Sequence, residues 1–268
     1  MICDSHLHYG DPVEMECIVA SSSLRNRVPC YQTVQFQEMG DYEAQLKKHN
    51  IDKTVLVPSV FREHERKQES MRCIEYAKRD PEKYFPYILL DEKQLEFLEE
   101  HVKEIVGVKE HIVLHESILT KEKCEIFKLM EEHGLILLLH SQKDRRVEYV
   151  KSILKQFPKL KIQIAHMGRG AGRDTAMCRT VFQEFRSYAN IVFDTSTIRE
   201  PEVLKAAVEL VGAERILYGS DFPFFMDAEG KEDIMEEQIE QVFKANLTER
   251  ERDAIFYENF CRFVTYGT

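Results

Sequence analysis

Two histidines close to the N-terminus, His6 and His8, are separated by a single residue. If the stretch that starts at Ile2 is a strand, alternate side chains share a face, and the two imidazoles point the same way about 6–7 Å apart. Neutral imidazole is a common ligand of zinc and other divalent first-row metals. A His-x-His pair alone is also typical of ordinary surface or core histidines, so its meaning depends on the rest of the chain.

Further imidazole, carboxylate and amine groups stand where apolar segments of the chain end. They are Lys109, His140, His166, Asp194 and Asp221. Three imidazoles and one carboxylate can form a ligand set for a divalent metal. Each residue also has a structural interpretation. His140 and His166 are compatible with buried core histidines. Asp221 is compatible with a helix N-cap, and we interpret Asp194 as a cap or turn residue.

The elements that would position these residues alternate along the chain. A first short strand starts at Ile2, and residues 9–39 form a long loop that we interpret as a lid. Seven more strands are expected at 53–58, 84–90, 105–109, 135–140, 161–166, 190–194 and 215–220. Helices are expected between them at 41–50, 63–79, 92–103, 121–133, 145–156, 175–188 and 201–210, followed by closing helices at 231–245 and 248–264.

Eight strands that alternate with helices predict an α/β fold with a parallel sheet. Strands such as 135–139 are continuous apolar runs, as in a parallel sheet covered on both faces. The strand count and the length of 268 residues favour one (β/α)8 TIM barrel domain over 1–268, with a long loop after strand 1. The competing open sheet would carry a glycine-rich nucleotide motif after its first strand. The glycines at 168–172 have the wrong spacing and follow the sixth strand.

A barrel of this kind carries its active site at the C-terminal ends of its strands. Four of the ten histidines and Asp221 would then surround one mouth, which makes a chance arrangement the weaker explanation. His111 and His115 follow the expected fourth strand, and we interpret them as solvated loop residues.

The composition argues against several classes of partner. The formal net charge is −10 and the pI is about 5.6, whereas nucleic acid or an anionic membrane surface requires a basic footprint. Seven cysteines, an odd number without a Cys-x-x-Cys pair, favour reduced thiols over a disulfide framework. There is no signal-like N-terminal segment, and no apolar stretch approaches the ~20 residues of a membrane span. We therefore expect a cytoplasmic protein.

The chain resembles the amidohydrolase superfamily, in the branch of small metal-dependent hydrolases and decarboxylases called amidohydrolase-2. The phrases that carry the resemblance run from end to end of the chain in family order. They are Asp4-Ser5-His6-Leu7-His8, His49-Asn50-Ile51-Asp52-Lys53, Gly107-Val108-Lys109-Glu110-His111, Leu139-His140, Ala165-His166-Met167-Gly168, Tyr218-Gly219-Ser220-Asp221-Phe222-Pro223 and Glu258-Asn259-Phe260-Cys261-Arg262-Phe263.

The resemblance implies a catalytic divalent metal, Zn²⁺ in first place and Mn²⁺ in second. The ligands that it implies are His6, His8, His140 and Asp221. It places His166 beside the metal, where it polarises the substrate or holds the metal-bound water. Our mechanistic hypothesis is that Asp221 accepts the proton of that water and later passes it to the leaving group. Lys109 would either bridge two metals as a carboxylated lysine or bind substrate. Homologues of this kind are often homodimers.

The substrate expected from these residues is a small anion. Arg169 and Arg173 lie in the loop after the sixth strand, which leads into a helix, and can hold a carboxylate or phosphate. The alternative is that they are solvated or pair with glutamates. Three functions stay open: hydrolysis of an amide, lactone or ester, non-oxidative decarboxylation of an aromatic or unsaturated acid, and ligand binding by a barrel without catalysis.

Overall fold

The computed structural model describes residues 1–10, 39–58, 65–112, 114–141, 143–170, 174–224 and 233–268. The expected lid at 9–39 lies almost wholly outside these ranges. The described cysteines are free thiols, as the sequence predicts, namely Cys3, Cys73, Cys124, Cys178 and Cys261. Within the described ranges, no helix is both long and apolar enough to cross a membrane.

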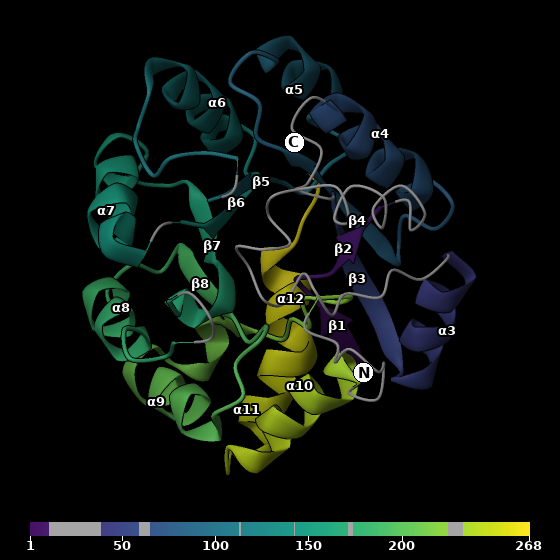
Figure 1. Ribbon diagram of the computed structural model, residues 1–268, viewed down its shortest axis with the longest axis vertical. Helices are drawn as coiled ribbons and strands as arrows, with labels where there is room; N and C mark the ends of the chain where they lie inside the picture. Colours follow the sequence, from purple (N-terminus) through teal and green to yellow (C-terminus); the bar gives the residue numbers. More distant parts are fainter. Residues whose placement is uncertain (11–38, 59–64, 113, 142, 171–173, 225–232) are drawn as a thin grey trace, which may run out of the picture.

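Parallel strands form the inner ring of the molecule (Figure 1). Their bounds are β1 Ile2–Asp4, β2 His8–Tyr9, β3 Ile51–Pro58, β4 Tyr84–Leu89, β5 Gly107–His111, β6 Ile136–His140, β7 Lys161–Ile164, β8 Ile191–Asp194 and β9 Ile216–Leu217. They pair in the order β1-β3-β4-β5-β6-β7-β8-β9, and β2 pairs with the end of β3. Ser5 N donates to Tyr218 O at 2.9 Å, which joins the last strand to the first.

Most of the helices surround this ring on the outside (Figure 1). They are α3 Met39–Lys48, α4 Arg66–Ala77, α5 Leu95–His101, α6 Lys121–Glu132, α7 Arg146–Gln156, α8 Cys178–Phe185, α9 Pro201–Val211, α10 Ile234–Lys244, α11 Glu249–Asp253 and α12 Asn259–Phe263. A π-helical turn, Ala254–Glu258, joins the last two, so the expected closing helix is continuous with a local widening. The fold is the (β/α)8 barrel that the alternation of elements predicts.

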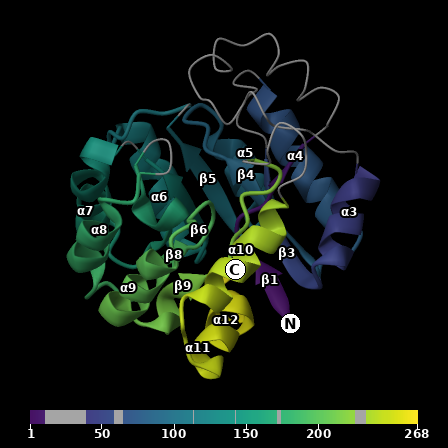
Figure 2. The same cartoon turned by 60° about the horizontal axis from the view of Figure 1, so that its bottom comes forward.

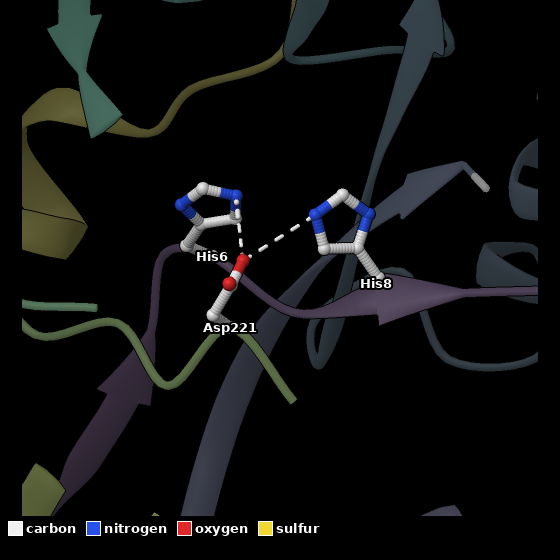
Figure 3. A group of neighbouring side chains, drawn as sticks. All are labelled: His6, His8 and Asp221. Carbon is white, nitrogen blue, oxygen red and sulfur yellow. Dashed lines mark ion pairs between the residues drawn. The ribbon is translucent and has the colours of Figure 1, made fainter. Parts of the chain in front are cut away.

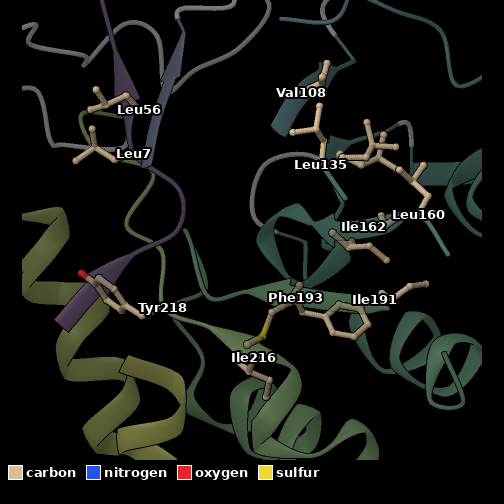
Figure 4. Close-up of a cluster of buried hydrophobic side chains, with 14 of the residues drawn as sticks. Leu7, Leu56, Val108, Leu135, Leu160, Ile162, Ile191, Phe193, Ile216 and Tyr218 are labelled. Atoms are coloured by element: carbon tan, nitrogen blue, oxygen red, sulfur yellow. The ribbon is translucent and has the colours of Figure 1, made fainter. Parts of the chain in front are cut away.

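The apolar strands are buried on both faces because side chains alternate across a strand. In β6, Ile136 and Leu138 belong to the cluster inside the barrel. Leu137 and Leu139 belong to the larger cluster between the strands and the helices, part of which is shown in Figure 4. This two-sided burial explains why the strand reads as an unbroken apolar run.

The closing helices cover the end of the barrel at which the strands begin. Figure 2 shows α11 and α12 beside β9 and the start of β1. Phe260 of α12 packs edge-on against Phe85 of β4, with ring centroids 5.4 Å apart, and both belong to the inner cluster. Apolar side chains therefore close this end of the barrel, and the histidines of interest lie at the opposite end, where the strands finish.

Three strands end earlier than the sequence predicts. β1 ends at Asp4, β7 ends at Ile164, and β9 covers only Ile216–Leu217. Left-handed residues follow two of these strands: His166, with φ 55°, lies in the turn after β7, and Asp221, with φ 63°, lies after β9. Left-handed residues cannot continue a strand.

Candidate metal centre

His6, His8 and Asp221 meet at the C-terminal end of the barrel (Figure 3). Asp221 Oδ1 lies 3.3 Å from His6 Nε2 and 3.5 Å from His8 Nε2. All three side chains are buried. The expectation of one continuous strand for both histidines is wrong, because β1 stops at Asp4 and β2 starts at His8. The histidines converge because the chain turns between these strands.

Backbone contacts hold the two segments of this group together. Asp221 N donates to His6 O at 2.7 Å. The buried carboxylate of Asp4 accepts from His6 N at 3.0 Å and from Ser220 N at 3.1 Å. Asp221 adopts a left-handed φ that non-glycine residues rarely show and that the surrounding structure must enforce. The barrel seam therefore fixes the position of the Asp221 carboxylate.

The tautomer of His6 follows from its partner on the far side of the ring. His6 Nδ1 lies 3.1 Å from Asp194 Oδ2, which also accepts from Gln163 Nε2 at 2.8 Å. Burial raises the pKa of Asp194, but His6 and the hydrogen bonds outweigh it and bring the pKa to about 2. An ionised carboxylate only accepts, so we assign the proton of His6 to Nδ1. Its Nε2 is left with a lone pair that faces Asp221.

His8 is arranged in the same way. Its Nδ1 lies 3.4 Å from the carbonyl oxygen of Pro58, which can only accept, and a proton on Nδ1 leaves Nε2 with the lone pair that a metal ligand needs. Burial lowers the pKa of His8 to about 4, which makes it a neutral imidazole at pH 7. Burial raises the pKa of Asp221, yet His6 and His8 more than offset this and the net pKa lies below its ordinary value.

With both ring protons on Nδ1, three lone pairs converge, from His6 Nε2, His8 Nε2 and Asp221 Oδ1. Acceptors at such distances repel one another unless a positive charge lies beside them, which the Lys109 ammonium or a bound cation can supply. Two imidazole nitrogens and a carboxylate oxygen are donors that suit zinc and other divalent first-row metals. The residues present therefore fit the divalent metal that the sequence implies.

Lys109 adjoins the same point. Its Nζ lies 2.9 Å from His6 Nε2, and the side chain is fully buried on β5. Burial lowers the pKa of Lys109 to about 8, against the opposing effect of Asp221 and Asp194. The structure thus brings Lys109 to the group, as its strand-end position indicated, while its role as a bridge or a substrate ligand stays a prediction.

His140 and His166 form a second pair beside the first group. His140 Nδ1 and His166 Nε2 are 3.3 Å apart, and the ring of His166 stacks on His6 with centroids 5.0 Å apart. Ser196 donates its hydroxyl hydrogen to Asp194 Oδ1, and its Oγ lies 2.7 Å from His166 Nδ1. We therefore assign an N–H to His166 Nδ1 and another to His140 Nδ1, which leaves His140 Nε2 with a lone pair.

Two groups of three residues in the described chain have ligand atoms within 4.8 Å of one another. They are His6, His8 and Asp221, and His6, His166 and Asp194. His140 belongs to neither group and is linked to them through His166. Its place as the fourth ligand, together with the catalytic roles of Asp221 and His166, stays a prediction.

Two residues differ from what the sequence predicts. Asp194 does accept from backbone N–H groups, but its fully buried carboxylate also orients His6, so it is more than a cap or turn residue. His111 is a buried residue at the end of β5, and its ring centroid lies 4.5 Å from that of His140. The solvated role expected for His111 is wrong because β5 runs two residues further than predicted. His115 is half-buried, with Nε2 3.1 Å from Arg66 Nη1.

Of the two arginines expected to bind an anion, Arg169 lies within the described residues. Arg169 is buried, and it donates from Nε to Thr197 Oγ1 at 2.6 Å and from Nη1 to Gly170 O at 2.8 Å. The alternative of a solvated side chain is therefore wrong for Arg169. Arg173 lies outside the described residues.

A (β/α)8 barrel with imidazoles and a carboxylate at the C-terminal ends of its strands has the architecture of a barrel enzyme. More particularly, the chain belongs to the amidohydrolase family, whose model Amidohydro_2, described as amidohydrolase, matches residues 3–263. A comparison with curated protein sequences gives no match.

Solved structures share the fold at low sequence identity. An amidohydrolase from Burkholderia multivorans with bound zinc is 13% identical, with a TM-score of 0.75 and 99% of each chain covered. A probable 2-pyrone-4,6-dicarboxylic acid hydrolase from Acinetobacter baumannii with citric acid bound is 15% identical, with a TM-score of 0.73 and 98% of each chain covered. The 5-carboxyvanillate decarboxylase from Sphingomonas paucimobilis is 12% identical, with a TM-score of 0.69 and 99% of each chain covered.

Proposed function

We propose that this protein is a metal-dependent hydrolase that cleaves an amide, lactone or ester bond in a small anionic substrate. The observation that carries the proposal is the convergence of three possible ligand atoms, His6 Nε2, His8 Nε2 and Asp221 Oδ1, at the mouth of the barrel. The amidohydrolase family supports it, and so does the zinc bound by the amidohydrolase from Burkholderia multivorans. His140 Nε2, which carries a lone pair in our assignment, is the proposed fourth ligand.

A divalent metal at this point would supply a Lewis acid that polarises a carbonyl and activates water. Asp221 is the proposed base: Oδ1 faces the two histidines, and a carboxylate has a second oxygen that can take up a proton and return it to the leaving group. His166, stacked on His6, is the proposed partner of the developing oxyanion. Asp194 holds His6 in the tautomer that a metal ligand needs.

An anionic substrate is favoured by the positive charge at the ends of β6 and β7. Arg169 is buried there, and so is Arg146, whose guanidinium donates to the uncharged acceptors Ser141 Oγ, Ser141 O and Gly168 O. Uncharged acceptors leave the field of Arg146 intact, and a buried field attracts an anion more strongly than one exposed to water. A carboxylate on the substrate fits this environment.

The same charge suits a second candidate function, non-oxidative decarboxylation of an aromatic or unsaturated acid. The shared fold of 5-carboxyvanillate decarboxylase adds support at the level of architecture. The two reactions are distinguished by their products, since only decarboxylation releases CO2. A barrel that only binds a ligand is the weakest of the three hypotheses, because a binder has no need for three converging metal donors.

The test starts with the metal content of the purified protein, measured by plasma mass spectrometry after reconstitution with zinc or manganese. We expect about one equivalent in the native chain and a clear loss in His140→Ala. The control is His133→Ala, which changes a half-buried histidine at the C-cap of α6 and should retain the metal. Two equivalents in the native chain would support a bridging Lys109. No metal in any of the three proteins would overturn the proposal.

The loaded protein is then assayed with lactones, amides, esters and aromatic carboxylic acids, with CO2 trapped in parallel. Hydrolysis without CO2 release is the expected result. CO2 release from an aromatic acid would establish the second candidate. In either case His6→Ala should lower turnover by orders of magnitude, and unchanged turnover by rigorously metal-free protein would exclude the mechanism.

A further inference from the structure

Arg146, the first residue of α7, lies buried between the ends of β6 and β7. Its Nε donates to Ser141 Oγ at 3.2 Å and its Nη2 donates to Ser141 O at 2.9 Å. The other terminal nitrogen, Nη1, donates to the carbonyl oxygen of Gly168. One side chain therefore ties together the two loops that follow β6 and β7.

Both acceptors adjoin a histidine of the site. Ser141 directly follows His140, and Gly168 follows His166 by two residues. The turn that contains His166 has three consecutive left-handed residues, with φ 55° at His166, 51° at Met167 and 74° at Gly168. Non-glycine residues in this region are strained, and they persist only where surrounding contacts hold them. The bond from Arg146 to Gly168 is one of those contacts.

Burial of the Arg146 guanidinium would be energetically unfavourable if its contacts served packing alone. Burying a charge among uncharged acceptors is unfavourable compared with burying an apolar side chain of similar size. A planar fork with several N–H donors can reach two loops at once in a fixed geometry, which neither an apolar side chain nor lysine can do. The chemistry of the side chain therefore matches a demand for exact placement of the two loops.

We propose that Arg146 is a positioning residue that sets the separation of His140 and His166 by fixing the loops that follow β6 and β7. The contact that depends on it is the 3.3 Å approach of His140 Nδ1 to His166 Nε2. Through that contact Arg146 holds His140 in the tautomer that carries its proton on Nδ1 and offers the Nε2 lone pair to a metal. The inference deepens the proposed function, and rests on it for the metal chemistry of these histidines.

The chain offers a matched control at the opposite end of the barrel. Arg215 is also buried and also donates to backbone carbonyls, from Nε to Val211 O at 2.9 Å and from Nη1 to Phe185 O at 2.9 Å. It lies just before β9, where that strand begins. Loss of either arginine should lower the free energy of unfolding, but only Arg146 faces loops of the site.

The experiment compares Arg146→Lys and Arg146→Ala with Arg215→Lys. Long-range ¹H–¹⁵N spectra of the metal-free proteins report the tautomers of the His140 and His166 rings. Competition with a chromophoric chelator gives the dissociation constant for zinc. We expect both Arg146 variants to shift the ring signals of His140 and His166 and to weaken zinc binding by about 10- to 100-fold. Arg215→Lys should lower the melting temperature and leave both readouts unchanged.

Two further measurements guard against a variant that folds poorly. Ser141→Ala removes one acceptor of Arg146 and should shift the same ring signals by a smaller amount. Added guanidinium ion should restore the native ring signals to Arg146→Ala, which a general loss of stability would not allow. Native ring signals in folded Arg146→Lys and Ser141→Ala would overturn the inference. Failure of the native protein itself to bind zinc would instead refute the proposed function, and the ring signals would still decide the role of Arg146.

Discussion

The carboxylate of Asp194 acts on the site through His6. It contacts His6 Nδ1, the ring nitrogen on the side opposite Asp221. Asp194→Asn keeps the shape of the side chain, but its amide can donate to His6 Nδ1 and thereby move the ring proton to Nε2. A protonated Nε2 cannot bind a metal, so we predict zinc binding weaker by about 10- to 100-fold. The measurement is chelator competition, combined with ¹⁵N shifts of the His6 ring.

The control for this prediction is Asp253→Asn, which changes an exposed carboxylate on α11 and should leave zinc binding unchanged. Native affinity in Asp194→Asn, with the His6 proton still on Nδ1, would contradict the tautomer assignment. Loss of affinity in both variants would point to a general effect of net charge.

The sequence predicted which residues gather, and missed how their atoms are used. Strand-end positions were enough to bring His6, His8, Lys109 and Asp221 to one mouth, because a parallel barrel places all strand ends together. They did not identify Asp194 as the partner of His6 Nδ1, since that depends on which ring nitrogen faces which strand. They also placed His111 in solvent, because the end of β5 was predicted two residues early.

At the level of elements, Asp233 fixes the start of α10. Its Oδ1 accepts from Met235 N and Glu236 N, both at 3.1 Å, and its Oδ2 accepts from Lys48 Nζ at 2.6 Å and lies 2.7 Å from His49 Nε2. Asp233→Ala removes an N-cap and the link to α3, so we predict a loss of about 1–2 kcal/mol in the free energy of unfolding. Urea denaturation measures it, and Glu240→Ala, an exposed ion-pair residue, should stay within about 0.5 kcal/mol.

The stability from Asp233 should depend on pH in a defined direction. Burial raises its pKa, but Lys48 and the other hydrogen bonds outweigh this, and the folded pKa lies below the ordinary value of 3.8. A depressed folded pKa means that the stabilisation is complete above the unfolded pKa and is lost as pH falls through the folded one. The difference in free energy of unfolding between the native protein and Asp233→Asn should be constant from pH 7 to about 5 and shrink below about pH 4. A difference that grows on acidification would contradict this assignment.

The packing of the turn after β7 against α8 gives a second prediction at the level of elements. Gly168 has φ 74°, and a Cβ added there would lie 2.9 Å from Val181 Cγ1 of α8. Gly168→Ala should therefore lower the free energy of unfolding by the cost of a left-handed alanine, about 1–2 kcal/mol, plus a clash of about 1–3 kcal/mol. Gly134→Ala isolates the first contribution, since φ is 68° there and a Cβ would meet no atom within 4 Å.

Urea denaturation of Gly168→Ala, Gly134→Ala and the double variant Gly168→Ala with Val181→Ala separates the two effects. The double variant should recover part of the clash beyond the loss expected from Val181→Ala alone. If Gly168→Ala and Gly134→Ala lower the free energy of unfolding equally, α8 moves to accept the new methyl group.

Element types and order were predictable because strand and helix periods differ clearly along most of the chain. In β6 the continuous apolar run indicates a strand buried on both faces. In α6 and α10 the helical spacing of the buried residues indicates amphipathic helices. Boundaries failed at β1, β7 and β9, where contacts distant in sequence override local propensity. His166 and Asp221 take left-handed conformations that no local pattern signals.

At the scale of the whole molecule, His6, His8 and Asp221, the proposed metal ligands, lie across the seam that closes the barrel. His6 and His8 follow β1, Asp221 follows β9, and Ser5 N bonds Tyr218 O between these strands. A ligand that binds both sides of a seam binds the folded barrel and not the unfolded chain. Free zinc at about 100 times its dissociation constant should therefore raise the free energy of unfolding by about 2.7 kcal/mol.

Thermal or urea denaturation with and without zinc measures this stabilisation, and a chelator should reverse it. His6→Ala removes a ligand on the β1 side and Asp221→Ala removes one on the β9 side, so each should abolish the response to zinc. His133→Ala, distant from the seam, should respond as the native chain does. An equal response to zinc in all four proteins would place the bound metal elsewhere. Loss of the response in the His6 and Asp221 variants alone would show that the two strand ends hold the metal together.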